Sequence, residues 1–168
     1  MFVSGGSALG EKLYDEFKVL GMPIYEGYGL TETAPVLTVN PFQRSRKGSA
    51  GKPLPGVEIG IFHPDKEGIG EIIAQRPSLM EGYYNNPTAT EAVIQDGWFH
   101  TGDAGYTDED GYIYIHDRVK DMIVSGGENI YPAEIENALS GHAAVAEVAV
   151  IGVPDERWGK AVKAVIVL

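Results

Sequence analysis

The sequence contains no cysteine. A disulfide framework, a thiolate zinc site and a cysteine nucleophile are therefore all excluded. Basic residues are also scarce, because 13 Lys and Arg stand against 24 Asp and Glu and leave a formal net charge of -11. A chain this acidic is not expected to bind along a nucleic acid backbone. It can still bind a nucleotide, since phosphate recognition needs only a few local donors.

Long apolar segments are missing as well. No apolar run reaches the roughly 18 residues of a membrane span, and the start of the chain lacks the basic and then apolar pattern of a signal peptide. We therefore expect a cytoplasmic protein without a transmembrane segment, and leave peripheral association with a membrane open.

The four histidines, at positions 63, 100, 116 and 142, show no metal-ligand spacing.

Glycine, in contrast, is abundant. The chain has 22 glycines in 168 residues, about twice the usual frequency of roughly 7%. They follow no period and stand beside polar residues, so they indicate tight turns and close approaches of the backbone to a ligand. The hydrophobic share of 43% and the charged share of 22% are typical of a folded globular chain.

Short helices and strands alternate along the sequence. Near the start, Leu9, Leu13 and Phe17 recur at every fourth position, and Ser7 can cap the helix that they predict. Apolar segments between turn residues predict strands. Helices are expected over residues 8–20, 87–94 and 132–139, and strands over residues 23–28, 57–62, 70–75, 112–116, 121–125, 145–153 and 161–168. The fold class is therefore mixed α/β, and the basic stretch 40–56 is expected to be irregular.

The segment Tyr28-Gly29-Leu30-Thr31-Glu32 has side chains suited to a nucleotide site. Tyr28 offers a flat aromatic face for adenine, and Thr31 offers a hydroxyl and a backbone N–H for a phosphate. Glu32 offers a carboxylate oxygen, a ligand that suits Mg²⁺. Gly29 permits a bend of the backbone. Taken alone, the same segment could be a simple turn between a strand and a loop.

Four other segments can each be explained by structure alone. In order along the chain, they could form a Gly-Gly turn before a helix cap, a solvated turn with an aspartate, an exposed charged linker and a hairpin turn. Their occurrence together nevertheless argues against coincidence. The segments are Gly5-Gly6-Ser7-Ala8-Leu9, Trp98-Phe99-His100-Thr101-Gly102-Asp103, Tyr114-Ile115-His116-Asp117-Arg118-Val119-Lys120-Asp121 and Ser125-Gly126-Gly127-Glu128-Asn129-Ile130-Tyr131-Pro132.

In this order, the segments resemble those of the adenylate-forming enzymes, which include acyl- and aryl-CoA synthetases, peptide-synthetase adenylation domains and beetle luciferases. The resemblance runs over nearly the whole chain and implies sites for ATP or AMP, Mg²⁺ and coenzyme A. The implied nucleotide-site residues are Gly5, Gly6, Ser7, Glu26, Gly27, Tyr28, Gly29, Ile115 and Arg118, with Asp103 on the ribose. The implied catalytic residues are Thr31, on the α-phosphate, and Glu32, on Mg²⁺. The implied hinge residue is Lys120, and the implied CoA-binding residues are Ser125, Gly126, Gly127 and Glu128.

The resemblance also implies a division of the chain. Residues 1–117 would be the C-terminal portion of the large nucleotide-binding domain, with a strand and helix piece and a small β-rich subdomain. Residues 118–121 would be a hinge, and residues 122–168 the first part of the small α+β C-terminal domain. The family's Ser/Thr/Gly-rich phosphate loop and its catalytic lysine find no match in the sequence. We therefore expect an internal piece of a longer enzyme.

The implied reaction joins a carboxylic acid to AMP with release of pyrophosphate, and then passes the acyl group to coenzyme A. Three segments look most like those of fatty-acyl-CoA ligases, so a medium- or long-chain fatty acid is the expected substrate. An adenylation domain that loads a carrier protein is an alternative, and so is a non-catalytic module with a degenerate nucleotide site. The three segments are Arg46-Lys47-Gly48-Ser49-Ala50-Gly51-Lys52-Pro53-Leu54-Pro55-Gly56, Met80-Glu81-Gly82-Tyr83-Tyr84-Asn85-Asn86-Pro87 and Gly127-Glu128-Asn129-Ile130-Tyr131-Pro132.

We predict that the 168-residue chain by itself turns over no ATP. Stabilising the transition-state charge requires preorganised donors around the phosphate, and the phosphate loop and the lysine that would supply most of them find no match. The measurement is ATP–pyrophosphate exchange by the isolated chain with a panel of carboxylic acids. Exchange at rates typical of enzymes would overturn the prediction.

Overall fold

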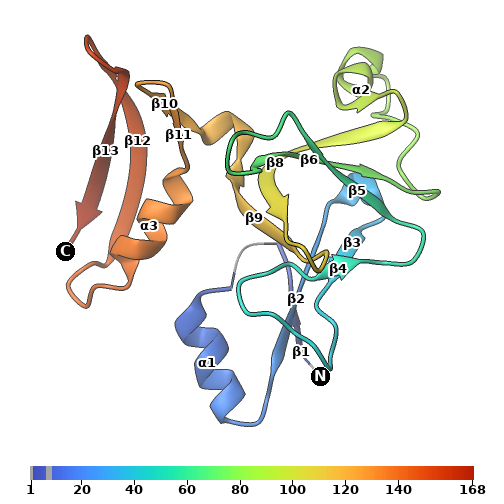
Figure 1. Cartoon of the computed structure of the whole chain (residues 1–168), viewed down its shortest axis with the longest axis horizontal. Helices are drawn as coiled ribbons and strands as arrows, with labels where there is room; N and C mark the ends of the chain where they lie inside the picture. The colour runs from blue at the N-terminus through green and yellow to red at the C-terminus, as the bar shows by residue number, and fades with distance from the viewer. Residues whose placement is uncertain (1, 7–8) are drawn as a thin grey trace. The chain divides into compact units, whose positions relative to one another are not determined.

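The computed structural model describes residues 2–6 and 9–168. The chain forms two compact units, residues 1–115 and residues 116–168 (Figure 1). Both units contain helical and strand elements, so the predicted mixed α/β class is confirmed. Within the described residues, no helix combines the length and the apolar character needed to cross a membrane.

The described part of the first unit contains two sheets. The four-stranded sheet has the order β1-β2-β3-β4, with β1 and β2 parallel and the other pairs antiparallel. The second sheet has the order β5-β6-β8-β7, and β9 also pairs with β8. The elements are β1 (Phe2–Ser4), α1 (Glu11–Val19), β2 (Ile24–Gly29), the 3-10 helix η1 (Thr31–Thr33), β3 (Val36–Val39), β4 (Lys52–Pro53), β5 (Glu58–Phe62), β6 (Gly70–Gln75), α2 (Pro87–Val93), β7 (Ile94–Gln95), β8 (Trp98–Thr107) and β9 (Ile113–Arg118), the last of which ends in the second unit.

The second unit packs one helix against a long hairpin. Helix α3 packs against β12, and β12 and β13 pair antiparallel along their whole length. The Glu136 carboxylate on the helix accepts a hydrogen bond of 2.7 Å from the N–H of Val150, so the helix and the strand are also joined by a polar contact. The elements are η2 (Val119–Asp121), β10 (Ile123–Ser125), β11 (Glu128–Ile130), α3 (Pro132–Ser140), β12 (Glu147–Asp155) and β13 (Gly159–Val167).

Helix α1 is shorter than predicted at its start. It begins after Gly10, whose extended backbone stands at the N-cap position. Ser7, the predicted cap, and Ala8 lie outside the described residues. The predicted stop is confirmed, because α1 ends before Gly21, which has a φ of +71°. A left-handed glycine is a common way to end a helix.

The position of Asp103 in strand β8 rules out one of the two interpretations of its sequence segment. Asp103 could have been a solvated turn residue, but it lies inside β8 and is only 8% exposed. Asp and Gly are rare in strands, so the Gly102-Asp103 pair lowers the strand propensity of this segment and β8 could not be predicted from it. Pairing with β6, β7 and β9 decides the outcome, because neighbouring strands satisfy the backbone of β8.

The other predicted strands and helices are confirmed within a few residues at their ends. The short strands β1, β3, β4, β7 and β11 are absent from the sequence-based prediction. Each has fewer than five residues, and a run this short carries too little periodicity to be recognised.

The core of the first unit lies between elements of both sheets. Leu37 of β3 and Ala74 of β6 are fully buried and form one cluster with Val57. Burial of this apolar surface stabilises the packing of one sheet on the other. The partly buried side chains packed against the cluster are Tyr28, Leu30, Leu54 and Ile59.

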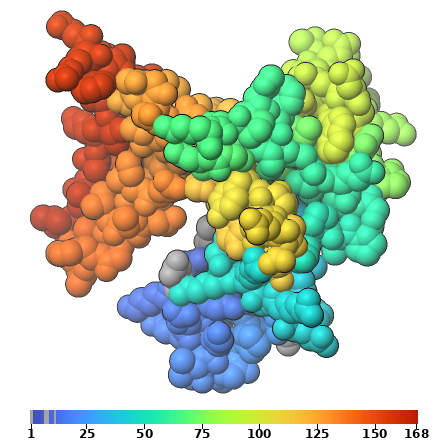
Figure 2. Space-filling view, viewed as in Figure 1, coloured from blue at the N-terminus to red at the C-terminus, as the bar shows by residue number. Residues whose placement is uncertain are grey.

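The basic stretch 40–56 is irregular apart from β4, as predicted, and polar contacts fix it. The Asn40 side chain, which is 1% exposed, donates to the Ser49 carbonyl at 2.6 Å and accepts from the N–H of Arg46 at 2.9 Å. The Arg46 guanidinium forms ion pairs with two aspartates of the turn 108–111. Figure 2 shows this turn (yellow) against the stretch (cyan). The positive charge of Arg46 is therefore largely neutralised within the first unit.

We predict that Leu37→Ala lowers the free energy of unfolding by about 2–5 kcal/mol, because it leaves a cavity in a fully buried position. Chemical denaturation of the variant and of the parent protein is the measurement. Leu20→Ala is the matched control, since Leu20 is 67% exposed and its truncation should change stability by about 0.5 kcal/mol or less. Equal losses in the two variants would contradict the described core.

Candidate functional site

Tyr28 and Asp103 lie 75 residues apart in the sequence and meet through a hydrogen bond. The phenol of Tyr28, on β2, donates to Oδ2 of Asp103, on β8, at 2.6 Å. The Tyr28 ring also packs against the buried cluster around Leu37, so its position is fixed by the core. A short hydrogen bond to a carboxylate is charge-assisted and stronger than a neutral one. The structure thus brings together the two side chains that the resemblance assigns to adenine and ribose.

A bulge in the pairing of β6 with β8 sets the direction of Asp103. The register shifts between Glu71 and Ile73. The Glu71 carboxylate fills the irregularity, because it accepts from the N–H of Gly102 at 2.9 Å and lies 2.8 Å from Nδ1 of His100. Bulges re-aim side chains near functional sites. Asp103 lies within the bulged part of β8, between His100, which pairs with Ile73, and Ala104, which pairs with Glu71.

Thr31 and Glu32 lie on the single turn η1, which Thr33 fixes. Thr33 is fully buried, and its hydroxyl accepts from the N–H of Leu30 at 3.0 Å. Gly29 precedes the turn at a close crossing of two chain segments. A Cβ atom on Gly29 would lie 1.8 Å from a backbone carbonyl oxygen of the segment that follows η1, so only glycine fits. Thr31 is exposed and Glu32 is half-buried, so both side chains remain accessible.

Glu32 contacts a segment that lies about 50 residues further along the chain. The Tyr83 phenol donates to Oε1 of Glu32 at 2.9 Å, and the N–H of Met80 donates to the backbone carbonyl oxygen of Glu32 at 2.8 Å. Partial burial raises the pKa of Tyr83, and the Glu32 carboxylate raises it further. The phenol is therefore a protonated donor at neutral pH.

The donor set at Glu32 fits a magnesium ion held jointly by the protein and a nucleotide. Among the described residues, no group of three or more His, Asp or Glu side chains could hold a metal ion by itself. Mg²⁺ at nucleotide sites usually takes one or two protein carboxylates, and phosphates and water complete its shell. Glu32 supplies one carboxylate, of which Tyr83 contacts only Oε1.

Gly5 and Gly6 follow β1 and lie beside β2. A Cβ atom on Gly5 would lie 3.2 Å from the carbonyl oxygen of Gly27, and Gly6 has a φ of +93°. The structure therefore brings Gly5 next to Gly27, another residue assigned to the nucleotide site. Ser7, assigned to the same site, lies outside the described residues.

Glu26 ties the start of the chain to β2. Its Oε1 atom accepts a hydrogen bond of 3.2 Å from the N–H of Leu9. Burial raises the pKa of Glu26, while hydrogen bonds from the backbone of Leu9 and Gly48 act in the opposite direction. This carboxylate therefore has a structural role that the sequence did not indicate.

The residues assigned to the hinge follow an anchored aspartate. In the second unit, Oδ2 of Asp117 accepts from the N–H of Ala133 at 2.9 Å, at the first turn of α3. Asp117 thereby satisfies one of the donors that a helix leaves unpaired at its N-terminus. Arg118 and Lys120 follow and are exposed. Ile115, assigned to the nucleotide, is half-buried at the end of the first unit.

Gly126 and Gly127 form the turn of the hairpin between β10 and β11, in which Ser125 pairs with Glu128. Both glycines have positive φ, +59° and +90°. Two-residue hairpin turns of this kind follow the natural twist of the strands. The Trp158 ring packs so closely that a Cβ atom on Gly126 would lie 2.5 Å from it. The segment has the shape of a hairpin turn, and its contact with coenzyme A stays a prediction.

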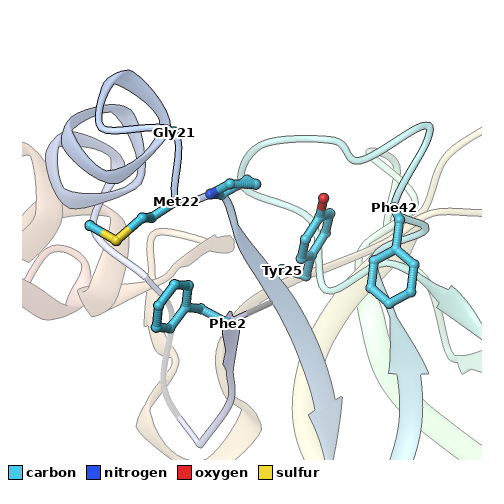
Figure 3. A pocket seen from close by; sticks show the side chains of 6 residues that line it. Phe2, Gly21, Met22, Tyr25 and Phe42 are labelled. Carbon is cyan, nitrogen blue, oxygen red and sulfur yellow. The ribbon is translucent and has the colours of Figure 1, made fainter.

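An apolar pocket of about 280 Å³ lies near the beginnings of β1 and β2 (Figure 3). Tyr25 and Phe42 make an edge-to-face contact there, with ring centroids 4.8 Å apart. No residue assigned to the nucleotide site lines this pocket. The lining residues are Phe2, Gly21, Met22, Pro23, Tyr25 and Phe42.

Two family models match the sequence. Residues 1–84 match the model of the AMP-binding enzymes, and residues 134–168 match the model of the AMP-binding enzyme C-terminal domain. The chain belongs to the AMP-binding enzyme family. The first match includes the Tyr28–Glu32 segment, and the family agrees with the resemblance drawn from the motifs.

Curated relatives of the chain include ligases for different acids. A feruloyl-CoA synthase of an Amycolatopsis species is 46% identical over 97% of this chain and 35% of its own length. A long-chain-fatty-acid–CoA ligase of Bacillus subtilis is 45% identical over 99% of this chain and 31% of its own length. The chain thus spans about a third of the length of these relatives.

Solved structures share the fold of the chain. The o-succinylbenzoate CoA synthetase of Bacillus subtilis, in complex with its acyl-adenylate intermediate, matches with a TM-score of 0.90 and 42% identity over 98% of this chain and 35% of that chain. The same enzyme in complex with ATP and a magnesium ion matches with a TM-score of 0.88 and 42% identity over 99% of this chain and 36% of that chain. The fold is therefore that of the adenylate-forming enzymes.

The sequence-based prediction does not include two residues that contact the site, Tyr83 and Glu71. The segment around Tyr83 indicates only a substrate class, and nothing in its local pattern points to Glu32. Glu71 had a usable signal, because it is an acidic residue next to the apolar residues Ile72, Ile73 and Ala74 of strand β6. Partly buried acids in strands commonly have a polar partner.

We predict that Tyr28→Phe weakens AMP binding by the full-length protein about tenfold, because the Asp103 carboxylate loses the charge-assisted hydrogen bond that orients it. Calorimetry with AMP is the measurement. The control is Tyr25→Phe on the same strand, whose hydroxyl has no hydrogen bond among the described residues. If both variants bind AMP as the parent protein does, the hydrogen bond has no role in the nucleotide site.

Proposed function

We propose that the protein carrying this chain is an ATP-dependent acid–thiol ligase that makes an acyl-CoA through an acyl-adenylate. The observation that carries the proposal is the hydrogen bond of 2.6 Å between Tyr28 and Asp103, which joins two motifs assigned to one nucleotide. Membership of the AMP-binding family supports it. So does the likeness to a CoA synthetase solved with its acyl-adenylate.

In the first half-reaction, a carboxylate oxygen of the acid attacks the α-phosphorus of ATP. The bond from that phosphorus to pyrophosphate breaks, pyrophosphate leaves and the acyl-adenylate remains. Tyr28 would stack on adenine, and Asp103 would accept hydrogen bonds from the ribose hydroxyls. The Thr31 hydroxyl and N–H would hold the α-phosphate. Such a reaction depends mainly on positioning and on stabilisation of developing charge.

Glu32 would hold Mg²⁺ through its carboxylate, as the donor set allows. When bound, the metal neutralises charge on the phosphate oxygens. The backbone of Gly5, Gly6 and Gly27 would leave room for the base, because glycine carries no side chain to block its approach.

In the second half-reaction, the sulfur of coenzyme A attacks the carbonyl carbon of the adenylate. The bond from that carbon to the phosphate oxygen breaks, AMP leaves with the electron pair, and the thiol proton of coenzyme A is released to solvent. We propose that the hairpin 125–128 lines the path of coenzyme A and that Lys120 is the hinge between residues 1–117 and residues 122–168. Hinge rotation is a common way to exchange one set of active-site groups for another.

We propose a medium- or long-chain fatty acid as the substrate, from the resemblance of three segments to fatty-acyl-CoA ligases. The long-chain-fatty-acid–CoA ligase of Bacillus subtilis supports this choice at 45% identity. Ferulate and o-succinylbenzoate are the competing substrates to be tested, since their ligases are similarly related.

The test uses the full-length protein with ATP, Mg²⁺ and octanoate, palmitate, ferulate or o-succinylbenzoate. We expect pyrophosphate exchange that depends on the acid and is most efficient with a fatty acid, and acyl-CoA detected by mass spectrometry when coenzyme A is added. Exchange that is most efficient with another acid would change the proposed substrate and leave the proposed reaction unchanged. Exchange without any acyl-CoA would favour a carrier protein as the acceptor.

A pair of variants links this activity to the described site. Asp103→Asn removes the buried negative charge and should slow exchange at least about tenfold. The reason is that hydrogen bonds from the ribose hydroxyls to a charged carboxylate are stronger than those to a neutral amide. Asp96→Asn makes the same chemical change at an exposed turn and should leave exchange unchanged. A folded protein that shows no exchange with any acid would refute the proposed function.

A further inference from the structure

The segment around Tyr83 contacts both the side chain and the main chain of Glu32. The Tyr83 phenol donates to the carboxylate at 2.9 Å, and the N–H of Met80 donates to the backbone carbonyl oxygen at 2.8 Å. Arg76, just before this segment, donates to the carbonyl of Val36, just after η1. Two contacts therefore join this segment to the turn that carries Glu32, and a third joins the residue before the segment to the strand after the turn.

Helix α2 fixes Tyr83 in turn. The N–H of Tyr83 donates to Oγ1 of Thr90 at 2.9 Å, and the Thr90 hydroxyl donates to the carbonyl of Asn86 at 3.0 Å. Asn86 is the N-cap of α2, and its side chain accepts from the N–H of Ala89 at 3.1 Å. A Cβ atom on Gly82 would lie 2.8 Å from the Thr90 side chain, so the chain before Tyr83 is tightly packed on the helix.

We propose that Tyr83 is a positioning residue that holds the Glu32 carboxylate in the orientation required to bind Mg²⁺. The inference rests on the proposed function, in which Glu32 is the magnesium ligand. A glutamate that is half-buried on a single turn has several rotamers, and ordering them on binding a metal is costly. A hydrogen bond to Oε1 selects one orientation before the metal arrives.

The chemistry of the contact suits positioning. The phenol is a neutral donor, so the carboxylate keeps its negative charge for the cation. Among the described residues, no donor contacts the Oε2 atom of Glu32, and this oxygen is available to the metal. Carboxylates that bind metals are commonly held by such hydrogen bonds, and their loss weakens metal binding.

The test compares the full-length protein with its Tyr83→Phe and Tyr84→Phe variants. Tyr84 is the matched control, because it adjoins Tyr83 and is 93% exposed. Mn²⁺, as a spectroscopic substitute for Mg²⁺, is titrated by electron paramagnetic resonance in the presence of α,β-methylene-ATP. We expect Tyr83→Phe to weaken Mn²⁺ binding about fivefold, by loss of one hydrogen bond to the ligand. Tyr84→Phe should bind Mn²⁺ as the parent protein does.

A metal-free titration separates positioning from a general structural role. With EDTA present, the affinity for the ATP analogue should be the same in all three proteins. Equal Mn²⁺ affinities in all three proteins would overturn the inference and leave the proposed function standing. An equal loss of analogue affinity with and without metal in Tyr83→Phe would also overturn it. A parent protein that binds no analogue would overturn both the inference and the proposed function.

Variants of Thr90 provide a second test without any change to Tyr83 itself. Thr90→Val removes the hydroxyl that accepts from the N–H of Tyr83 and should weaken Mn²⁺ binding in the same direction as Tyr83→Phe. Thr90→Ser keeps the hydroxyl and should restore the affinity of the parent protein. If Thr90→Val retains full Mn²⁺ affinity while remaining folded, the helix does not act on Glu32 through Tyr83.

Discussion

The hydrogen bond from Tyr28 to Asp103 connects the two sheets of the first unit and joins two residues that the family resemblance assigns to the nucleotide. Its donor lies on β2 and packs against the buried cluster around Leu37, and its acceptor lies in a bulge of β8 that Glu71 fills. The core therefore sets the position of the ring, and the bulge sets the position of the carboxylate. A shift of either sheet would separate the two groups, so the arrangement of the site depends on this contact.

Contacts between residues distant in the sequence also hold two other acidic residues of the site in place. Glu32 is held by Tyr83, and Glu26 accepts from the backbone of Leu9. Each contact joins residues at least 17 positions apart in the sequence. Local structure supplies only the turn or strand on which each carboxylate sits. Long-range packing orients the carboxylate, and this is how a protein holds polar groups ready for a charged ligand.

Much of the local structure could be predicted from residue types. The turn at 108–111, the hairpin turn at Gly126-Gly127 and the start of α3 at Pro132 follow from rules for turns and helix ends. Strand β8 could not be predicted in this way, because its Gly and Asp residues are rare in strands and its neighbours stabilise it. Tyr83 was not recognised as a partner of Glu32 for a related reason, since nothing near it in the sequence records that contact.

The sequence by itself determined which chemical groups are present, their order along the chain and the family to which that order belongs. It also determined most turns and helix ends, because these depend on neighbouring residues. Only the tertiary structure decided that Tyr28 contacts Asp103, that Tyr83 contacts Glu32 and that Asp103 is buried. The physical reason is that these facts depend on how strands distant in the sequence pair and pack, and a local pattern contains no information about its distant partner.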